Sequence, residues 1–175
     1  MSPETTRNAI AGGLVALLEH GDQLERLRGE PELMGAAVEE ILRWTSPVSY
    51  FARRATRDTE VRGVPIAAGE RVTMWYPSAN RDEDVFESPF RFDISRAPNQ
   101  HVAFGGGGPH FCLGANLARF EISILFEELL ARDGRYQRNA PQWARVLAEL
   151  KQMTLGAEEP AQIALRLREA RRDLL

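Results

Sequence analysis

The chain has 175 residues, a formal net charge of -3 and 43% hydrophobic residues, the ordinary mix of a soluble globular protein. This charge gives no reason to expect a nucleic-acid partner. No apolar stretch approaches the ~20 residues that a membrane-spanning helix needs, and the N-terminus lacks the basic and apolar regions of a signal peptide. We therefore expect a cytoplasmic protein with no membrane span.

The first part of the chain predicts three helices. The first ends near His20-Gly21, and the second begins at a capping box formed by Asp22 and Glu25 and ends at Gly29. The third ends at Ser46-Pro47, because a residue before proline is pushed out of the α region. Apolar residues recur at helical spacing in the first and third helices: Ile10, Leu14, Leu17 and Leu18, then Met34, Val38, Ile41 and Leu42.

The pattern then changes to strands, a long loop and another helix. Between Tyr50 and Trp75, apolar residues separated by Gly63, Pro65 and Gly69 predict short strands joined by turns. Residues 80–102 lack regular periodicity, and a loop of this length is usually functional or wrapped around something. The predicted fold is therefore mainly α with a small β-sheet. The last helix is indicated by a further apolar stripe: Leu113, Leu117, Phe120 and Ile124.

A glycine-rich loop precedes this last helix and contains Cys112, the only cysteine of the chain; residues 104–119 read FGGGGPHFCLGANLAR. Glycines allow the backbone to approach a flat ligand closely, and a helix N-terminus carries roughly +0.5 charge, which favours a thiolate. A lone cysteine is often only a buried apolar residue. A phosphate-binding loop is the other alternative, but its Lys-Ser/Thr or second glycine spacing is missing. The loop therefore predicts an anionic cysteine.

The loop resembles the cysteine-ligand signature of the cytochrome P450 family, with Phe104, a glycine turn from Gly105, and then His110, Cys112 and Gly114. The resemblance implies that Cys112 is the axial thiolate of haem b, that Phe104 shields its sulfur and that His110 reaches a haem propionate. A thiolate ligand favours O–O bond cleavage in this chemistry. The loop has one glycine more than most members. In this it resembles the bacterial subgroup that hydroxylates sterol side chains and methyl-branched lipids.

The resemblance implies roles for two further groups of residues. Glu40 and Arg43 share one face of the third helix and could be a plain surface pair, and Glu39 could equally pair with Arg43. The resemblance implies instead that Glu40, Arg43 and Arg91 form a buried charge network that pins the long loop under the haem. Such a network fixes position rather than adding net stability. Arg53 stands where relatives place a propionate-binding arginine, unless it belongs to a solvated basic run.

At the N-terminus, Glu4 and Thr5 resemble the end of the acid–alcohol motif on the helix that crosses the distal face of the haem. Glu4 would relay protons and Thr5 would stabilise the bound dioxygen, although both also suit a helix start. The reaction implied is O2-dependent hydroxylation of a hydrophobic sterol or branched lipid. Its electrons would come from a ferredoxin and a ferredoxin reductase.

The resemblance divides the chain into two predicted domains. Residues 1–132 are expected to be the C-terminal, haem-binding half of a cytochrome P450-like domain, and residues 133–175 an atypical helical tail. Family members are well over twice as long, so we expect a truncated monooxygenase that leaves some apolar helix surface exposed. Two alternatives stay open: a non-catalytic haem-binding remnant, and an interaction module built on the helical tail.

Overall fold

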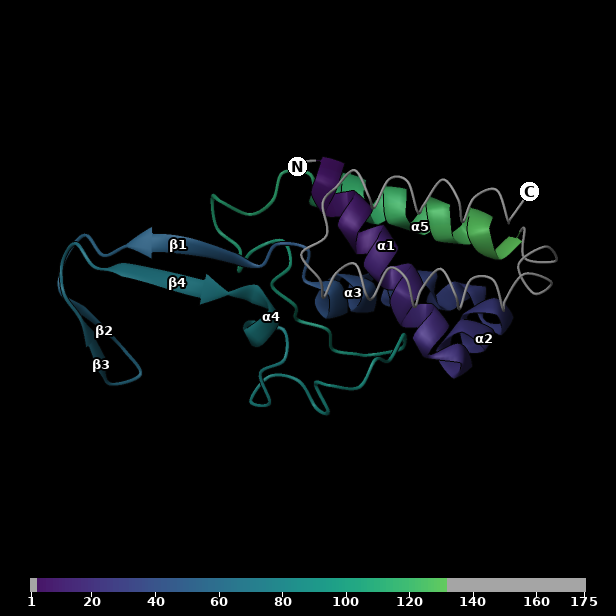
Figure 1. Ribbon diagram of the computed structural model, residues 1–175, viewed down its shortest axis with the longest axis horizontal. Coiled ribbons are helices and arrows are strands. Elements are labelled where there is room, and N and C mark those ends of the chain that lie inside the picture. The colour runs from purple at the N-terminus through teal and green to yellow at the C-terminus, as the bar shows by residue number, and fades with distance from the viewer. Residues whose placement is uncertain (1–2, 132–175) are drawn as a thin grey trace, which may run out of the picture. The chain divides into compact units, whose positions relative to one another are not determined.

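A computed structural model describes residues 3–131 of the chain (Figure 1). Contacts within the chain separate a compact unit of residues 1–127 from a second unit that begins at Glu128. The described residues are therefore residues 3–127 of the first unit, followed by residues 128–131, which continue its final helix. The predicted tail, residues 133–175, lies outside the described residues.

Helices dominate the described residues, and four short strands form two antiparallel pairs, which confirms the predicted fold class. None of these helices is both long and apolar enough to cross a membrane. In chain order the elements are α1 (Pro3–Glu19), α2 (Gly21–Gly29), the 3-10 turn η1 (Pro31–Leu33), α3 (Met34–Thr45), β1 (Tyr50–Arg54), β2 (Thr59–Val61), β3 (Val64–Ile66), β4 (Arg71–Trp75), α4 (Tyr76–Ala79) and α5 (Ala115–Ala131).

Helix α1 packs closely against α3. A Cβ atom built on Gly13 would lie 2.5 Å from Cγ2 of Ile41, and one on Gly12 would lie 2.7 Å from Cγ2 of Thr45. The helices can approach this closely only because these two residues have no side chain. Small residues therefore face α3, and of the apolar stripe predicted for this helix only Leu17 is fully buried.

The junction of α1 and α2 differs from the predicted capping box. Helix α2 begins one residue before Asp22, its N-cap is His20, and the cap has no side-chain hydrogen bond. Nδ1 of His20 lies 2.8 Å from the carbonyl oxygen of Ala16, and its ring packs against the rings of Trp44 and Phe92. Helix α2 thus begins two residues earlier than the Asp22–Glu25 capping box predicts, and His20 at its start is held in this aromatic cluster.

Helices α1, α2 and α3 share their core with part of the long loop. Four side chains are almost completely buried where these segments meet: Leu27, Ile41, Phe92 and Ile94. Residues 80–102 contain no helix or strand, as predicted. The loop is therefore held by what it packs against and bonds to, rather than by its own secondary structure.

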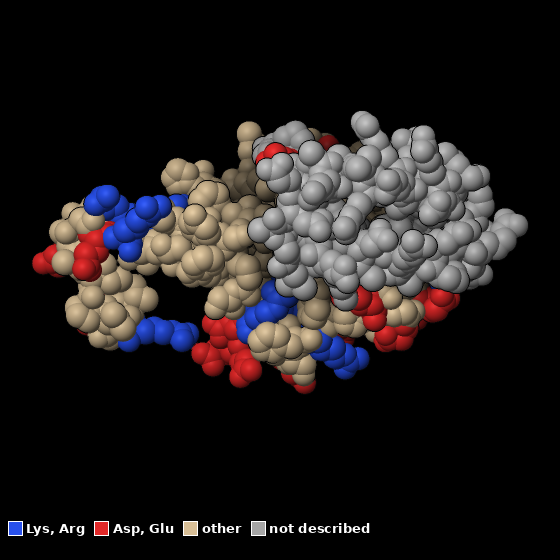
Figure 2. Space-filling view, in the orientation of Figure 1, with Lys and Arg blue, Asp and Glu red and all other residues tan. Residues whose placement is uncertain are grey.

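The strands form a hairpin that extends from the helices, with β2 and β3 at its far end (Figure 1). Strand β1 pairs with β4 from Tyr50 opposite Trp75 to Arg54 opposite Arg71, which confirms the predicted strands. Gly63 and Gly69 turn the chain at φ values of 79° and 89°. Charged side chains of both signs gather over these strands (Figure 2).

The structure confirms the predicted last helix as α5, and the apolar stripe that indicated it faces away from the core. Leu113, Leu117, Phe120 and Ile124 are all exposed, whereas Ala115, Ala118, Ile122 and Phe126 are buried. The helix carries apolar residues on more than one face, and the face with small alanines is the one that packs inward. Apolar helix surface is thus exposed in the described part of the chain.

The long loop is fixed to α3 by a buried ion pair. The guanidinium of Arg43 donates two hydrogen bonds to the Glu40 carboxylate, at 2.7 and 2.8 Å, and both side chains are 0% exposed. The same guanidinium donates to three loop carbonyls: Asn80 at 2.7 Å, Pro89 at 2.9 Å and Arg91 at 3.2 Å. Arg43 therefore satisfies backbone acceptors that the loop could not pair by itself.

The second cation of this network is Arg96, not Arg91 as predicted. Arg96 donates to Oε2 of Glu40 at 3.2 Å, and the backbone N–H of Asp93 donates to Oε1 at 2.9 Å. The Arg91 residue is exposed and contributes only its carbonyl oxygen. Both arginines follow α3 in the same loop, and only the path of the backbone decides which side chain reaches the carboxylate.

We predict that Glu40→Gln lowers the free energy of unfolding by about 3 kcal/mol or more, because Arg43 loses the charge that compensates its burial. Chemical denaturation measures this loss. The matched control is Glu25→Gln, which removes the carboxylate of an exposed Glu–Arg pair with the same three-residue spacing on α2. The control should leave stability within the error of the measurement. Equal effects of the two substitutions would show that the Glu40 pair behaves as a surface pair.

Candidate functional site

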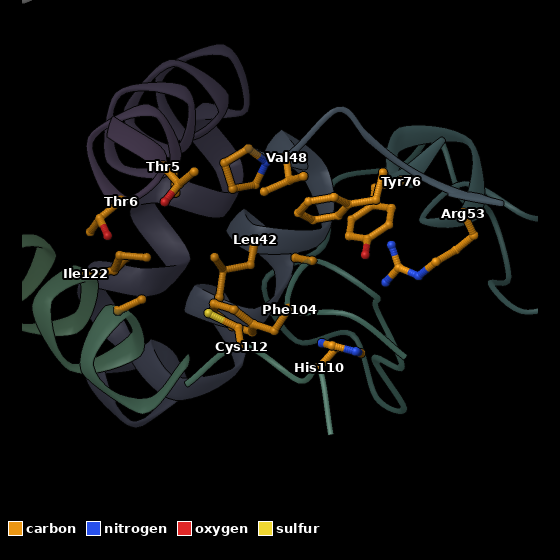
Figure 3. A pocket seen from close by; sticks show the side chains of 15 residues that line it. Thr5, Thr6, Leu42, Val48, Arg53, Tyr76, Phe104, His110, Cys112 and Ile122 are labelled. Atoms are coloured by element: carbon orange, nitrogen blue, oxygen red, sulfur yellow. The ribbon is translucent and has the colours of Figure 1, made fainter. Parts of the chain in front are cut away.

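A pocket of about 720 Å³ lies between α1, α3, β1, α4, the glycine-rich loop and α5 (Figure 3). Most of its wall is apolar, and a few polar side chains project into it. Such a composition is typical of a site for a largely hydrophobic ligand. Its lining residues are Thr5, Thr6, Ala9, Leu42, Pro47, Val48, Phe51, Arg53, Tyr76, Ala103, Phe104, His110, Cys112, Ala118 and Ile122.

Cys112 enters this pocket from a loop whose shape depends on glycine. Gly105 and Gly107 have φ values of 96° and 95°, in the left-handed region that side chains disfavour. The turn they allow brings the N–H of Cys112 to the carbonyl oxygen of Phe104, at 3.0 Å. The cysteine and the phenylalanine are therefore tied together at the backbone, and both side chains line the pocket.

The thiol of Cys112 lies next to the start of α5. The carbonyl of Cys112 accepts the first hydrogen bond, from the N–H of Ala115 at 3.1 Å, and Gly114 accepts from Ala118 at 2.9 Å. The unpaired N–H groups at a helix start favour a negative charge nearby. Cys112 itself is partly exposed toward the pocket. Cys112 thus lies directly before α5 and lines the pocket, the position that the sequence predicts for it.

Two predicted cofactor residues lie at one side of the pocket. In Figure 3, Arg53 and His110 lie on the side away from Thr5 and Thr6, and Cys112 lies between the two groups. Arg53 and His110 are both exposed at the rim, on β1 and on the glycine-rich loop. Their donor groups are suited to carboxylates of a bound molecule.

The opposite side of the pocket is formed by the start of α1. The structure brings Thr5 into the wall, together with the buried Thr6, which the sequence did not predict. Glu4 is exposed and is not among the lining residues. The two members of the predicted acid–alcohol motif therefore differ, since only Thr5 lines the pocket.

Behind the loop lies a polar cluster that sequence reasoning missed. Glu39 accepts two hydrogen bonds from Arg119 of α5, at 2.6 and 3.0 Å, and its Oε2 lies 2.9 Å from Nε2 of His101. Nδ1 of His101 accepts the N–H of Ala103 at 3.2 Å, so Nε2 carries the proton given to Glu39. Glu39 thereby connects α3 with both the loop and α5.

This cluster holds Glu39 in its charged form. Burial acts to raise the pKa of Glu39, but the hydrogen bonds from His101 and Arg119 outweigh it and lower this pKa to about 2. The signal available in the sequence was the adjacency of Glu39 and Glu40. Successive helix residues point about 100° apart, so the two carboxylates could not both face Arg43.

The donor set of the pocket suits haem. The sulfur of Cys112 can supply one soft ligand for iron, the apolar wall matches a flat hydrophobic ring, and the N–H groups of Arg53 and His110 at the rim can donate to its two carboxylates. Glycines in the cysteine loop leave room for a ring to approach the backbone. The residues that would hold the group are Cys112, Arg53 and His110, with Phe104 beside the sulfur.

Comparisons with known proteins agree on one family. The family model described as cytochrome P450 matches residues 2–132. The methyl-branched lipid omega-hydroxylase of Mycobacterium tuberculosis is 55% identical over 127 residues, which cover 72% of this chain and 30% of that protein. The steroid C26-monooxygenase of Rhodococcus jostii is 55% identical over 126 residues, which cover 72% of this chain and 26% of that protein.

Solved structures match the fold as well as the sequence. CYP109E1 from Bacillus megaterium, in complex with testosterone, superposes with a TM-score of 0.73 at 45% identity. The match covers 75% of this chain and 36% of that one. The chain thus spans roughly a third or less of the length of the relatives it matches.

The lowered pKa of Glu39 predicts a defined pH dependence. Because the folded-state pKa is about 2 and the ordinary value is 4.5, ionised Glu39 contributes stability above about pH 4.5. This contribution is lost as the pH falls toward 2. Glu39→Gln should therefore be less stable than the parent chain at about pH 6, and this difference should shrink at about pH 3. Denaturant unfolding at both pH values checks this, and an unchanged difference would contradict it.

Proposed function

The chain belongs to the cytochrome P450 family, and on this premise we propose that it is the haem-binding part of a monooxygenase, with Cys112 as the residue that would bind the haem iron through its sulfur. The observation that carries the proposal is the position of this cysteine. It lies at the start of a helix, on a loop shaped by glycines, with its side chain in a largely apolar pocket.

The polar residues of the pocket support specific roles in holding the cofactor. Arg53 and His110, exposed at one rim, would bind the two haem propionates through charge-assisted hydrogen bonds. Phe104, only 8% exposed, would cover the sulfur of Cys112 and keep water from it. Gly105 would let the backbone pass close to the ring. Gly114 would fix the start of α5, as its hydrogen bond to Ala118 supports.

When bound, haem supplies the redox chemistry that inserts one oxygen atom of O2 into a C–H bond. The residues of this chain would position the reacting groups and deliver protons to them. Cys112 would supply the sulfur ligand, and the hydroxyl of Thr5, on the opposite wall, would donate a proton to dioxygen. Glu4, exposed one residue earlier on α1, would resupply that proton from solvent.

The apolar wall of the pocket supports a hydrophobic substrate, and we infer a sterol or a methyl-branched lipid. The names of two relatives, a methyl-branched lipid omega-hydroxylase and a steroid C26-monooxygenase, point to the same class. The reaction consumes electrons as well as O2. We propose a ferredoxin and its reductase as their source, since neither the pocket nor its residues can supply them.

We predict that the purified chain, incubated with haemin, reduced and exposed to carbon monoxide, has the Soret band typical of thiolate-ligated haem. Cys112→Ala should lose this band completely, because the chain has no other cysteine. The matched control is Ser78→Ala, an exposed position on α4 outside the lining of the pocket, which should keep the band.

A histidine-type band in the parent chain, or no bound haem, would contradict the proposal and favour a non-catalytic remnant or an interaction module. Persistence of the thiolate band in Cys112→Ala would contradict the role assigned to this cysteine.

A further inference from the structure

We propose that Arg119 is a positioning residue that keeps the Phe104 ring over the sulfur of Cys112, and that Glu39 holds Arg119 in place. The proposal deepens the proposed function, because a shielded thiolate matters most as a ligand of haem iron. The contacts that carry it are independent of haem.

The guanidinium of Arg119 lies against the ring of Phe104. Its Cζ atom is 4.6 Å from the ring centroid, the shortest such contact among the arginines and aromatic rings of residues 3–131. A guanidinium over an aromatic face is attracted by the ring electrons, and its planar shape also stacks on the ring. Arg119 can therefore restrain both the position and the tilt of Phe104.

Arg119 is itself held by a two-point contact. Its Nε and Nη2 atoms donate to the two carboxylate oxygens of Glu39, at 2.6 and 3.0 Å. Two parallel hydrogen bonds fix the plane of a guanidinium, which a single contact cannot do. The other donor to this carboxylate, His101, has its ring centroid 6.0 Å from that of Phe104. The cluster therefore contacts Phe104 through two different residues.

Phe104 transmits this restraint to the cysteine. Its carbonyl oxygen accepts the N–H of Cys112 at 3.0 Å, and the two side chains lie together in the wall of the pocket (Figure 3). A ring that stays in this place would limit the access of water and reagents to the sulfur. A loosened ring would admit water and reagents, even with the rest of the fold intact.

The single thiol of the chain makes this testable without haem, since any thiol reaction reports on Cys112 alone. We would measure the rate of alkylation of the full chain by a small neutral reagent as a function of pH. The inflection of the profile reports ionisation of the thiol, whereas the limiting rate at high pH reports access to the sulfur. The limiting rate is the quantity that the proposal predicts.

Arg119→Leu should raise the limiting rate about two- to fivefold, the factor that corresponds to loss of a cation–π contact. Arg119→Lys should give an intermediate rate, because lysine keeps the charge but cannot stack or bond at two points. The matched control is Arg26→Leu, which breaks an Arg–Glu pair of similar side-chain exposure on α2, 39% against 33% for Arg119. The control should leave the rate unchanged.

A double-mutant cycle separates positioning from general loss of structure. In a Phe104→Ala background the sulfur is already uncovered, so Arg119→Leu should change the limiting rate by less than it does with Phe104 present. Equal changes in the two backgrounds, or no change in either, would overturn the proposal. If Arg119→Leu unfolds, Glu39→Gln, which keeps the side-chain volume, replaces it and should also raise the rate. If the variants show the expected alkylation rates but the parent chain gives no thiolate-type haem spectrum, only the proposed function is contradicted.

Discussion

The described structure depends on the buried pair of Glu40 and Arg43. Removing two charges from water is costly, and the pair offsets this only because its hydrogen-bonding groups are used elsewhere as well. Arg43 bonds to carbonyls of the long loop, and Glu40 accepts from the N–H of Asp93 and from Arg96. A segment without helix or strand thereby acquires one fixed path. The cysteine loop that follows starts from a defined point for the same reason.

The neighbouring carboxylate, Glu39, points to a different side of the same helix. It contacts His101, just before the glycine turn, and Arg119, just after the cysteine. Two adjacent carboxylates of α3 thus hold different segments. Glu40 holds the long loop that precedes the site. Glu39 holds the segments before and after Cys112. The thiol is positioned from two sides by polar contacts of Glu39, whereas the pocket that it faces is largely apolar. Because these polar residues are not among those that line the pocket, its largely apolar wall is free to bind a hydrophobic ligand.

Much of this could be predicted from local signals. Proline and glycine positions predicted the C-terminal end of α3 and the turns of the hairpin, because these residues restrict or permit particular backbone angles. Contacts between segments far apart in the chain could not be predicted from such local signals. Arg96 rather than Arg91 reaches Glu40, and α5 buries its alanine face rather than the stripe of Leu117 and Phe120. Both outcomes depend on packing between segments far apart in the chain, which periodicity does not report. The roles of Cys112, Arg53 and Thr5 remain predictions.

The two adjacent carboxylates of α3 also restrict the positions at which residues can be inserted into or deleted from the chain. Deleting one residue within this helix would rotate everything beyond it by about 100°, so that neither carboxylate could keep its partners 53 to 80 positions away. The turn between β2 and β3 carries no comparable constraint, since it lies exposed at the far end of the hairpin. Lengthening a flexible turn costs only about 0.6 kcal/mol per doubling. Insertions and deletions in evolution should therefore accumulate at the hairpin tip and spare α3.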